Sequence, residues 1–169
     1  SSFKLDCTTA DTSLNAGDNI LLKQRIEGQN LQDFAKGTSA AKQFAISFYV
    51  KTNKSGVYTV ELLDIDNDRI ASKTITVSDS NWNRYTLIFP ADTTGAFNND
   101  NAASLDLIIW LAAGTTFTSG TLNTSSWASK TNANRVSSSN VNIADSTSND
   151  WAITGVQLEV GSVATDFEH

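Results

Sequence analysis

Residues 150–161, DWAITGVQLEVG, decide the fold, because their apolar side chains alternate and the alternation changes phase partway. The apolar residues fall into two sets: Trp151 and Ile153 first, then Val156, Leu158 and Val160. A β-strand turns successive side chains to opposite faces, so the change at Thr154 and Gly155 requires one extra residue there. Glycine suits such a bulge because it accepts backbone angles that other residues resist. We predict a long, bent, mostly buried strand with the rest of a sheet on either side.

Other alternating stretches predict the remaining strands. The clearest is 43–52, where one face carries four apolar side chains: Phe44, Ile46, Phe48 and Val50. Shorter runs predict strands at residues 3–7, 19–26, 57–63, 75–77, 85–89 and 105–111, and residues 30–37 predict one helical turn. Strands at short, even spacing without long helices are typical of sandwiches. We therefore predict an all-β fold, a jelly-roll β-sandwich of two antiparallel sheets with at most short helical turns.

Composition and charge exclude several classes of protein. The chain has 169 residues, enough for one domain, and Cys7 is its only cysteine, which excludes an internal disulfide and a cysteine-based zinc site. No apolar run approaches the roughly 18 residues of a membrane span, so we expect no membrane insertion. The net charge is −6, and the basic residues are scattered. Nucleic acid is therefore not an expected partner, since its binding depends on clustered Lys and Arg.

Catalysis has little support in the sequence. His169, the only histidine, is the last residue, and no G-x-S-x-G motif occurs. A Ser-His-Asp arrangement cannot be built around a terminal histidine. Acidic residues are present throughout the chain, but most fall in expected loops or at strand ends, where solvation explains them. We therefore do not expect an enzyme.

Three aspartates resemble the beginning of a calcium-binding loop. Asp64, Asp66 and Asp68 give the spacing D-x-D-x-D. Arg69 then replaces the glycine that the turn requires, and Ile75 stands where a bidentate glutamate would be, which excludes an EF-hand. Two interpretations stay open: a hairpin tip at the surface, which we favour, and a site for structural calcium. No other cofactor is expected.

A polar segment, 112–149, is too long to be a simple connection and is rich in Ser, Thr, Asn and Ala. Val141 and Ile143 predict a brief strand within it. Trp127 lies in SSWASKTNANR, where an aromatic ring is surrounded by amide and hydroxyl groups. Sugars pack their C–H faces on aromatic rings and bond their hydroxyls to such groups, so we expect Trp127 to contact a ligand or a partner. Any ligand-binding surface is expected to involve this segment.

Two further aromatic residues are expected on the outer faces of the sheets. Tyr49 and Trp110 each point opposite to an apolar inward row. A large aromatic side chain in such a position can stack on a sugar or form a subunit interface, and for Trp110 both alternatives stay open. Trp82, at the start of its strand, is expected to be structural and to cover an edge of the sandwich.

Four phrases of the chain together resemble a known family: LLKQRIEGQNLQDFAKGTSAAK, FAISFYVKTNKSGVYTVELLDIDNDR, FPADTTGAFNNDNAASLDLIIWLAAGTTFTSG and NDWAITGVQLEVGSVATDFEH. They are similar to the carbohydrate-binding-module-like jelly-roll domain of bacteriophage virion proteins, of the tail-fibre, receptor-binding and head-decorating types. The likeness spans nearly the whole chain, and its most specific part is ITGVQLEVG followed by ATDFEH. The family carries no catalytic motif.

The resemblance implies a domain on the virion surface, in a tail fibre or on the capsid exterior, that binds host cell-surface carbohydrate. Residues 1–169 would form one domain of a longer virion protein, as its C-terminal or an excised part, with other virion proteins as partners and a homotrimer as its assembly. The alternative is a purely structural capsid-decoration or fibre-assembly domain without a glycan ligand. By resemblance alone, Asp6, Glu27 or Glu159 would contribute to a calcium site near the termini.

Overall fold

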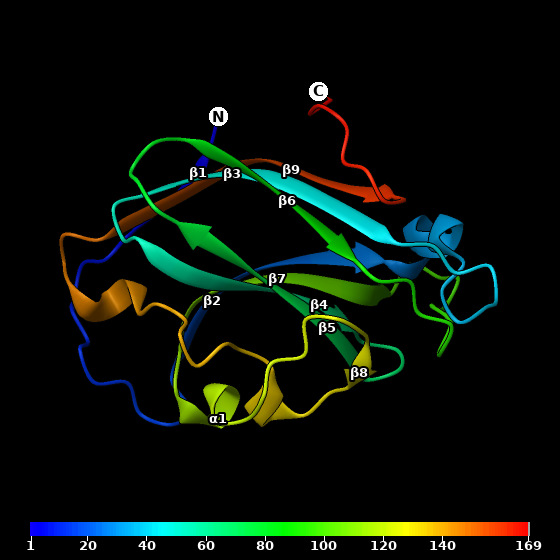
Figure 1. The fold of residues 1–169 in the computed structure, drawn as a ribbon, viewed down its shortest axis with the longest axis horizontal. Helices are drawn as coiled ribbons and strands as arrows, with labels where there is room; N and C mark the ends of the chain where they lie inside the picture. The colour runs from blue at the N-terminus through cyan, green and yellow to red at the C-terminus, as the bar shows by residue number, and fades with distance from the viewer. Residues whose placement is uncertain (169) are drawn as a thin grey trace.

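The computed structural model describes residues 1–168 and consists of two antiparallel β-sheets packed face to face (Figure 1). In spatial order, the four-stranded sheet contains β1 (Phe3–Asp6), β9 (Asp150–Val160), β3 (Phe44–Thr52) and β6 (Asn83–Phe89). The five-stranded sheet contains β2 (Asn19–Glu27), β7 (Ala103–Ala113), β4 (Gly56–Asp64), β5 (Arg69–Val77) and β8 (Ala128–Ser129). The main hydrophobic core lies between the two sheets.

The pairing of the strands is that of a jelly roll. Four antiparallel pairs are nested along the chain: β4 with β5, β3 with β6, β2 with β7, and β1 with β9. Nested pairs of this kind arise when one long antiparallel ribbon folds over as a unit, with its strands distributed between two sheets. The predicted fold class is confirmed.

The predicted bulge in β9 is also confirmed. The register of β9 against β3 shifts between two cross-strand pairs: Ser47 with Gln157, and Tyr49 with Thr154. Two residues of β9 therefore lie opposite Phe48 alone, and one of them, Gly155, has φ of 60°. Because of the extra residue, apolar side chains on both sides of the bulge contact the core: Trp151, Ile153, Val156 and Leu158.

Within residues 1–168, helical structure is limited to short turns, as expected. These are η1 (Gly28–Phe34), α1 (Thr115–Thr118), η2 (Asn132–Asn134) and η3 (Ile143–Asp145). The brief strand expected at Val141 and Ile143 is wrong, because Ile143 begins η3 and Asn140 forms only an isolated bridge. The side chain of Asn142 accepts a hydrogen bond from the backbone N–H of Ala144, which favours a helical turn over a strand.

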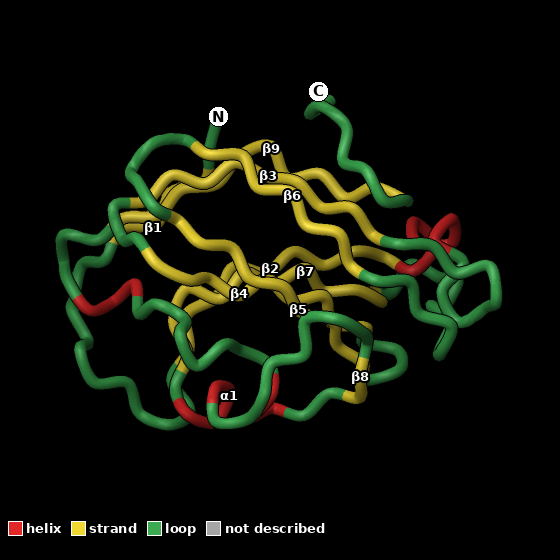
Figure 2. Tube along the Cα trace, in the orientation of Figure 1, coloured by secondary structure: helices red, strands yellow, loops and turns green. Residues whose placement is uncertain are grey.

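The polar segment is not structureless, and much of it lies on the outer side of the five-stranded sheet (Figure 2). Phe117 of α1 packs on Trp110 of β7, with ring centroids 5.2 Å apart. The N–H of Val136, a buried residue, donates to the carbonyl of Phe117 at 3.0 Å. Together with Ile108, these residues form a second apolar cluster outside the sandwich. This cluster explains why β7 is apolar on both faces.

Candidate functional site

Trp127, the expected contact for a ligand or a partner, lies inside the protein. Its side chain is 7% exposed and packs on Phe44, with ring centroids 5.6 Å apart. The indole Nε1 donates to the carbonyl of Pro90 at 2.8 Å, which satisfies the one polar atom that burial would otherwise leave unpaired. The physical reason for the inward position is β8, where Ala128 pairs with Ile70 and holds the preceding tryptophan against the core.

Trp110 does point away from the main core, as predicted, but it is only 1% exposed. Phe117 covers it, and the guanidinium of Arg135 lies 5.0 Å from its ring centre. Arg135 in turn forms an ion pair with buried Glu61, whose pKa is raised because burial outweighs the attraction of the guanidinium. The chain itself therefore covers the ring that was considered as a sugar platform or as a subunit interface.

Tyr49 lies on the outer face of the four-stranded sheet, as predicted, and is partly buried. A side chain added at Gly155 would come within 3.1 Å of its ring, so the tyrosine rests on the bulge. Its role in ligand or partner contact stays a prediction.

The C-terminal tail folds back over part of this face. Glu159 accepts hydrogen bonds from the N–H and hydroxyl of Thr165, and the hydroxyl bond lowers the pKa of that carboxyl. The N–H of Glu168 donates to the side chain of Gln157 at 3.1 Å, and Arg84 donates to the carbonyl of Thr165. The outer face of the four-stranded sheet is therefore occupied near the bulge and open towards β1.

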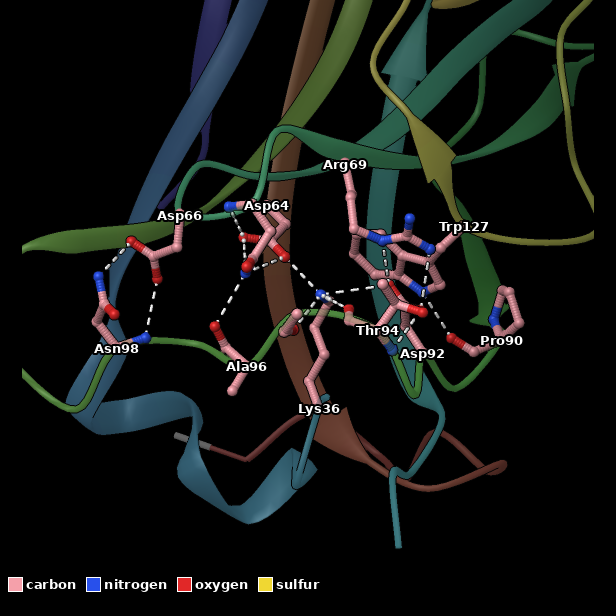
Figure 3. Close-up of polar contacts among 12 residues, drawn as sticks. Lys36, Asp64, Asp66, Arg69, Pro90, Asp92, Thr94, Ala96, Asn98 and Trp127 are labelled. Atoms are coloured by element: carbon pink, nitrogen blue, oxygen red, sulfur yellow. Dashed lines mark hydrogen bonds and ion pairs between the residues drawn. The ribbon is translucent and has the colours of Figure 1, made fainter. Parts of the chain in front are cut away.

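The three aspartates considered for a calcium site bind different partners, as Figure 3 shows for Asp64 and Asp66. Each has its own protein partner: Asp64 binds Lys36 and Asn67, Asp66 binds Asn98, and Asp68 binds Lys130. No group of three or more His, Cys, Asp or Glu side chains suited to a metal ion occurs within residues 1–168. Protein donors thus hold the aspartates of the hairpin tip.

Lys36 supplies the central positive charge of this region (Figure 3). Its side chain is fully buried, and its ammonium contacts the carboxylate of Asp64, that of Asp92 at 3.2 Å, and the carbonyls of Thr94 and Gly95 at 3.0 and 2.7 Å. It also lies 5.1 Å from the ring centre of Trp127. Every hydrogen of the ammonium therefore has a protein partner.

Asp92 connects this lysine to Arg69, whose guanidinium binds the carboxylate at 2.8 and 3.0 Å. Burial alone would raise the pKa of Asp92, but the bonds from Arg69 and Thr94, with the charge of Lys36, lower it below its usual value. The four charges of Lys36, Asp64, Asp92 and Arg69 cancel. A neutral, fully bonded cluster is suited to holding loops together and offers no free group to a substrate.

An open hollow lies instead on the outer face of the four-stranded sheet. Four side chains stand in one row across the strands: Lys4, Ala152, Lys51 and Trp82. The first three are register partners, and Trp82 comes directly before Asn83, the partner of Val50. Small Ala152 leaves a depression between the two lysines, and Ser2 and Asp150 complete the walls. The volume is about 240 Å³.

The hollow combines an exposed ring with charged groups. Trp82 is 42% exposed, the largest aromatic surface among the tryptophans described. Lys4 forms ion pairs with Asp6 at 2.8 Å and Asp150 at 3.4 Å, and its bond with Asp6 raises its pKa. Lys51 is exposed, and its side chain makes no hydrogen bond or ion pair within the described part of the chain. The site thus offers an apolar ring face, hydrogen-bonding charges and one free cation.

Sequence reasoning assigned Trp82 a structural role and missed this site. The available signal was its place just before a strand, with polar Asn81 and Asn83 on either side. A larger hollow, about 290 Å³, lies beside η1, but its only charged lining residue is the fully bonded Lys36. The hollow at Trp82 is therefore the better candidate for ligand binding.

The comparisons with known proteins do not bear on the candidate binding site, which rests on the geometry of the structure. No protein family, curated protein or solved structure matches the chain. Among the residues described, no helix is long and apolar enough to cross a membrane. The fold and the site define a jelly-roll domain with an open aromatic hollow on one sheet.

Proposed function

We propose that this protein is a non-enzymatic, carbohydrate-binding domain on the exterior of a bacteriophage virion, and that it binds host surface glycan in the hollow at Trp82. The observation that carries the proposal is the exposed ring of Trp82 beside paired and unpaired charges. The virion setting is supported by the resemblance of the closing stretch, ITGVQLEVG with ATDFEH, to virion jelly-roll domains.

The chemistry of the hollow suits a sugar. A pyranose presents an apolar C–H face that packs on an indole ring and hydroxyls that need donors and acceptors. Trp82 supplies the ring, while the ion pair of Lys4 and Asp150 supplies a donor and an acceptor in the same hollow. Lys4 and Asp150 lie on paired strands and Trp82 directly precedes β6, so the sheet holds the backbone of all three before binding.

A second candidate function, assembly without a glycan, has one observation in its favour. Phe3 in β1 is 51% exposed, and Val160 and Val163, at and after the end of β9, are 38% and 71% exposed. Apolar surface of this kind favours association by about 25 cal/mol for each Å² that it buries. Contact with other virion proteins, or a homotrimer in a tail fibre or on a capsid, would cover it.

A glycan array with matched variants tests the proposal. The variant Trp82→Ala is expected to lose at least about tenfold in glycan affinity, the size of a central aromatic contact, with an unchanged melting temperature. Ile65→Ala removes another exposed apolar side chain, 40% exposed and outside the hollow, and should bind like the wild type. An array without any bound glycan, combined with trimers in light scattering, would reject glycan binding in favour of assembly.

A further inference from the structure

We infer that the glycan is acidic: the hollow binds a saccharide with one carboxylate or phosphate group, which Lys51 holds while the sugar ring stacks on Trp82. This inference rests on the proposed function, because it concerns the same hollow. It adds the chemical class of the ligand and a residue that determines specificity.

The position of Lys51 is the first argument. In the row across the sheet it stands between Ala152, its register partner on β9, and Trp82. Its side chain therefore lines the same hollow as Trp82, next to it in the row. A charged group bound to a sugar in this place can reach the ammonium without leaving the indole face.

The second argument is that Lys51 has no partner in the protein. Of the twelve basic residues in the chain, only Lys42 and Lys51 make no hydrogen bond or ion pair through their side chains within residues 1–168. The ten others have partners: Lys4, Lys23, Arg25, Lys36, Lys54, Arg69, Lys73, Arg84, Lys130 and Arg135. Of the two, Lys51 lines the hollow at Trp82.

The third argument comes from the balance of charges. The chain carries a net charge of −6, so its long-range field repels polyanions. Among the residues that line the hollow, Lys4 pairs with Asp150, and also with Asp6 outside the lining, so Lys51 is the one lining charge without a partner in the described part of the chain. The carboxylate of Asp150 disfavours an anion on the Lys4 side. One anionic group next to Trp82 therefore matches the site, and a densely charged polymer does not.

The test is an array that pairs each acidic glycan with a neutral form of the same sugar. One arm compares uronic and sialic acid glycans with their carboxyl-reduced forms, and the other compares sugar phosphates with their dephosphorylated forms. We expect at least about tenfold tighter binding of the acidic member in one arm, the value of one hydrogen bond to a charged group. The arm that shows this difference identifies the anion.

Three variants assign the preference to its residue. Lys51→Gln is expected to remove the preference for the acidic member and to retain weak binding of both members, since Trp82 is intact. Lys51→Arg keeps the charge and should keep the preference. Lys42→Gln removes the other unpaired lysine and should bind like the wild type. Melting temperatures of all three should equal that of the wild type.

The outcomes separate this inference from the proposed function. Equal binding of acidic and neutral members, lost in Trp82→Ala, would overturn the acidic ligand and leave the carbohydrate site standing. An acidic preference that persists in Lys51→Gln would overturn the role of Lys51. The absence of binding to every glycan, acidic or neutral, would overturn both.

Discussion

Replacing Lys36 by methionine tests the buried ion cluster. Methionine replaces the aliphatic part of the side chain beside Phe97 and Trp127 and removes the ammonium. Asp64, which is fully buried, then keeps only the donors of Asn67, whereas Asp92 retains its two bonds from Arg69. The principal cost is thus one uncompensated buried carboxylate, for which about 3–5 kcal/mol is expected.

The measurement is the free energy of unfolding from urea denaturation at pH 7. Lys36→Met should lower it by about 3–5 kcal/mol, a large part of the stability of a typical domain. Adding Asp64→Asn should recover part of the loss, because the double variant no longer buries an unpaired charge, and the cycle measures the coupling. Lys42→Met is the matched control and should change stability by less than about 0.5 kcal/mol.

A loss below about 1 kcal/mol in Lys36→Met, or no recovery with Asp64→Asn, would refute the reasoning. Either result would mean that water reaches Asp64 and that the two groups do not depend on each other. The hairpin tip between β4 and β5 would then be held chiefly by its remaining contacts, such as the bonds from Asn98 to Asp66.

Two further predictions concern β9 and the tail. Gly155→Val should lower the free energy of unfolding by about 1–3 kcal/mol, measured by thermal melting, because φ is 60° and an added side chain would meet Tyr49 at 3.1 Å. The hydroxyl of Thr165 lowers the pKa of Glu159 in the folded protein. The ionised carboxylate therefore stabilises the folded tail fully above the pKa that Glu159 has in the unfolded chain, and this stabilisation is lost as the pH falls through the lower pKa of the folded state. We expect residues 165–168 to detach in acid, below about pH 4, as seen by NMR.

Each of these predictions has a control. Gly17→Val adds a side chain where no atom lies within 4 Å and should be nearly neutral, so equal losses at both glycines would contradict the strain at the bulge. Glu159→Gln keeps an acceptor but removes the titration. A tail that still detaches in acid in this variant would contradict the role assigned to Glu159.

The strands and the bulge could be predicted because each follows from the alternation of apolar residues along a short stretch of sequence. A strand exposes alternate residues, so the change of phase around Gly155 identifies both the buried strand and its irregularity without knowledge of its neighbours. The jelly-roll arrangement followed from the spacing of such stretches and from the resemblance of the chain to virion domains.

The roles of the aromatic residues could not be predicted in the same way. Periodicity identifies the face of a sheet to which Trp110 points, but it does not say that Phe117 and Arg135 will cover it. Trp127 lies in a polar stretch and is buried because the two residues after it pair with β5. Trp82 is exposed because it precedes β6. The alternation of apolar residues that predicts burial in this strand begins only after it.

The most direct test of the carbohydrate site is an NMR titration with the tightest glycan of the array, followed through the indole N–H signals of the four tryptophans. We predict that the signal of Trp82 shifts with the occupancy of the site and that those of Trp110, Trp127 and Trp151, which are at most 7% exposed, stay in place. Shifts centred on residues 114–140 with Trp82 unchanged would contradict the site, and so would the absence of any glycan that binds.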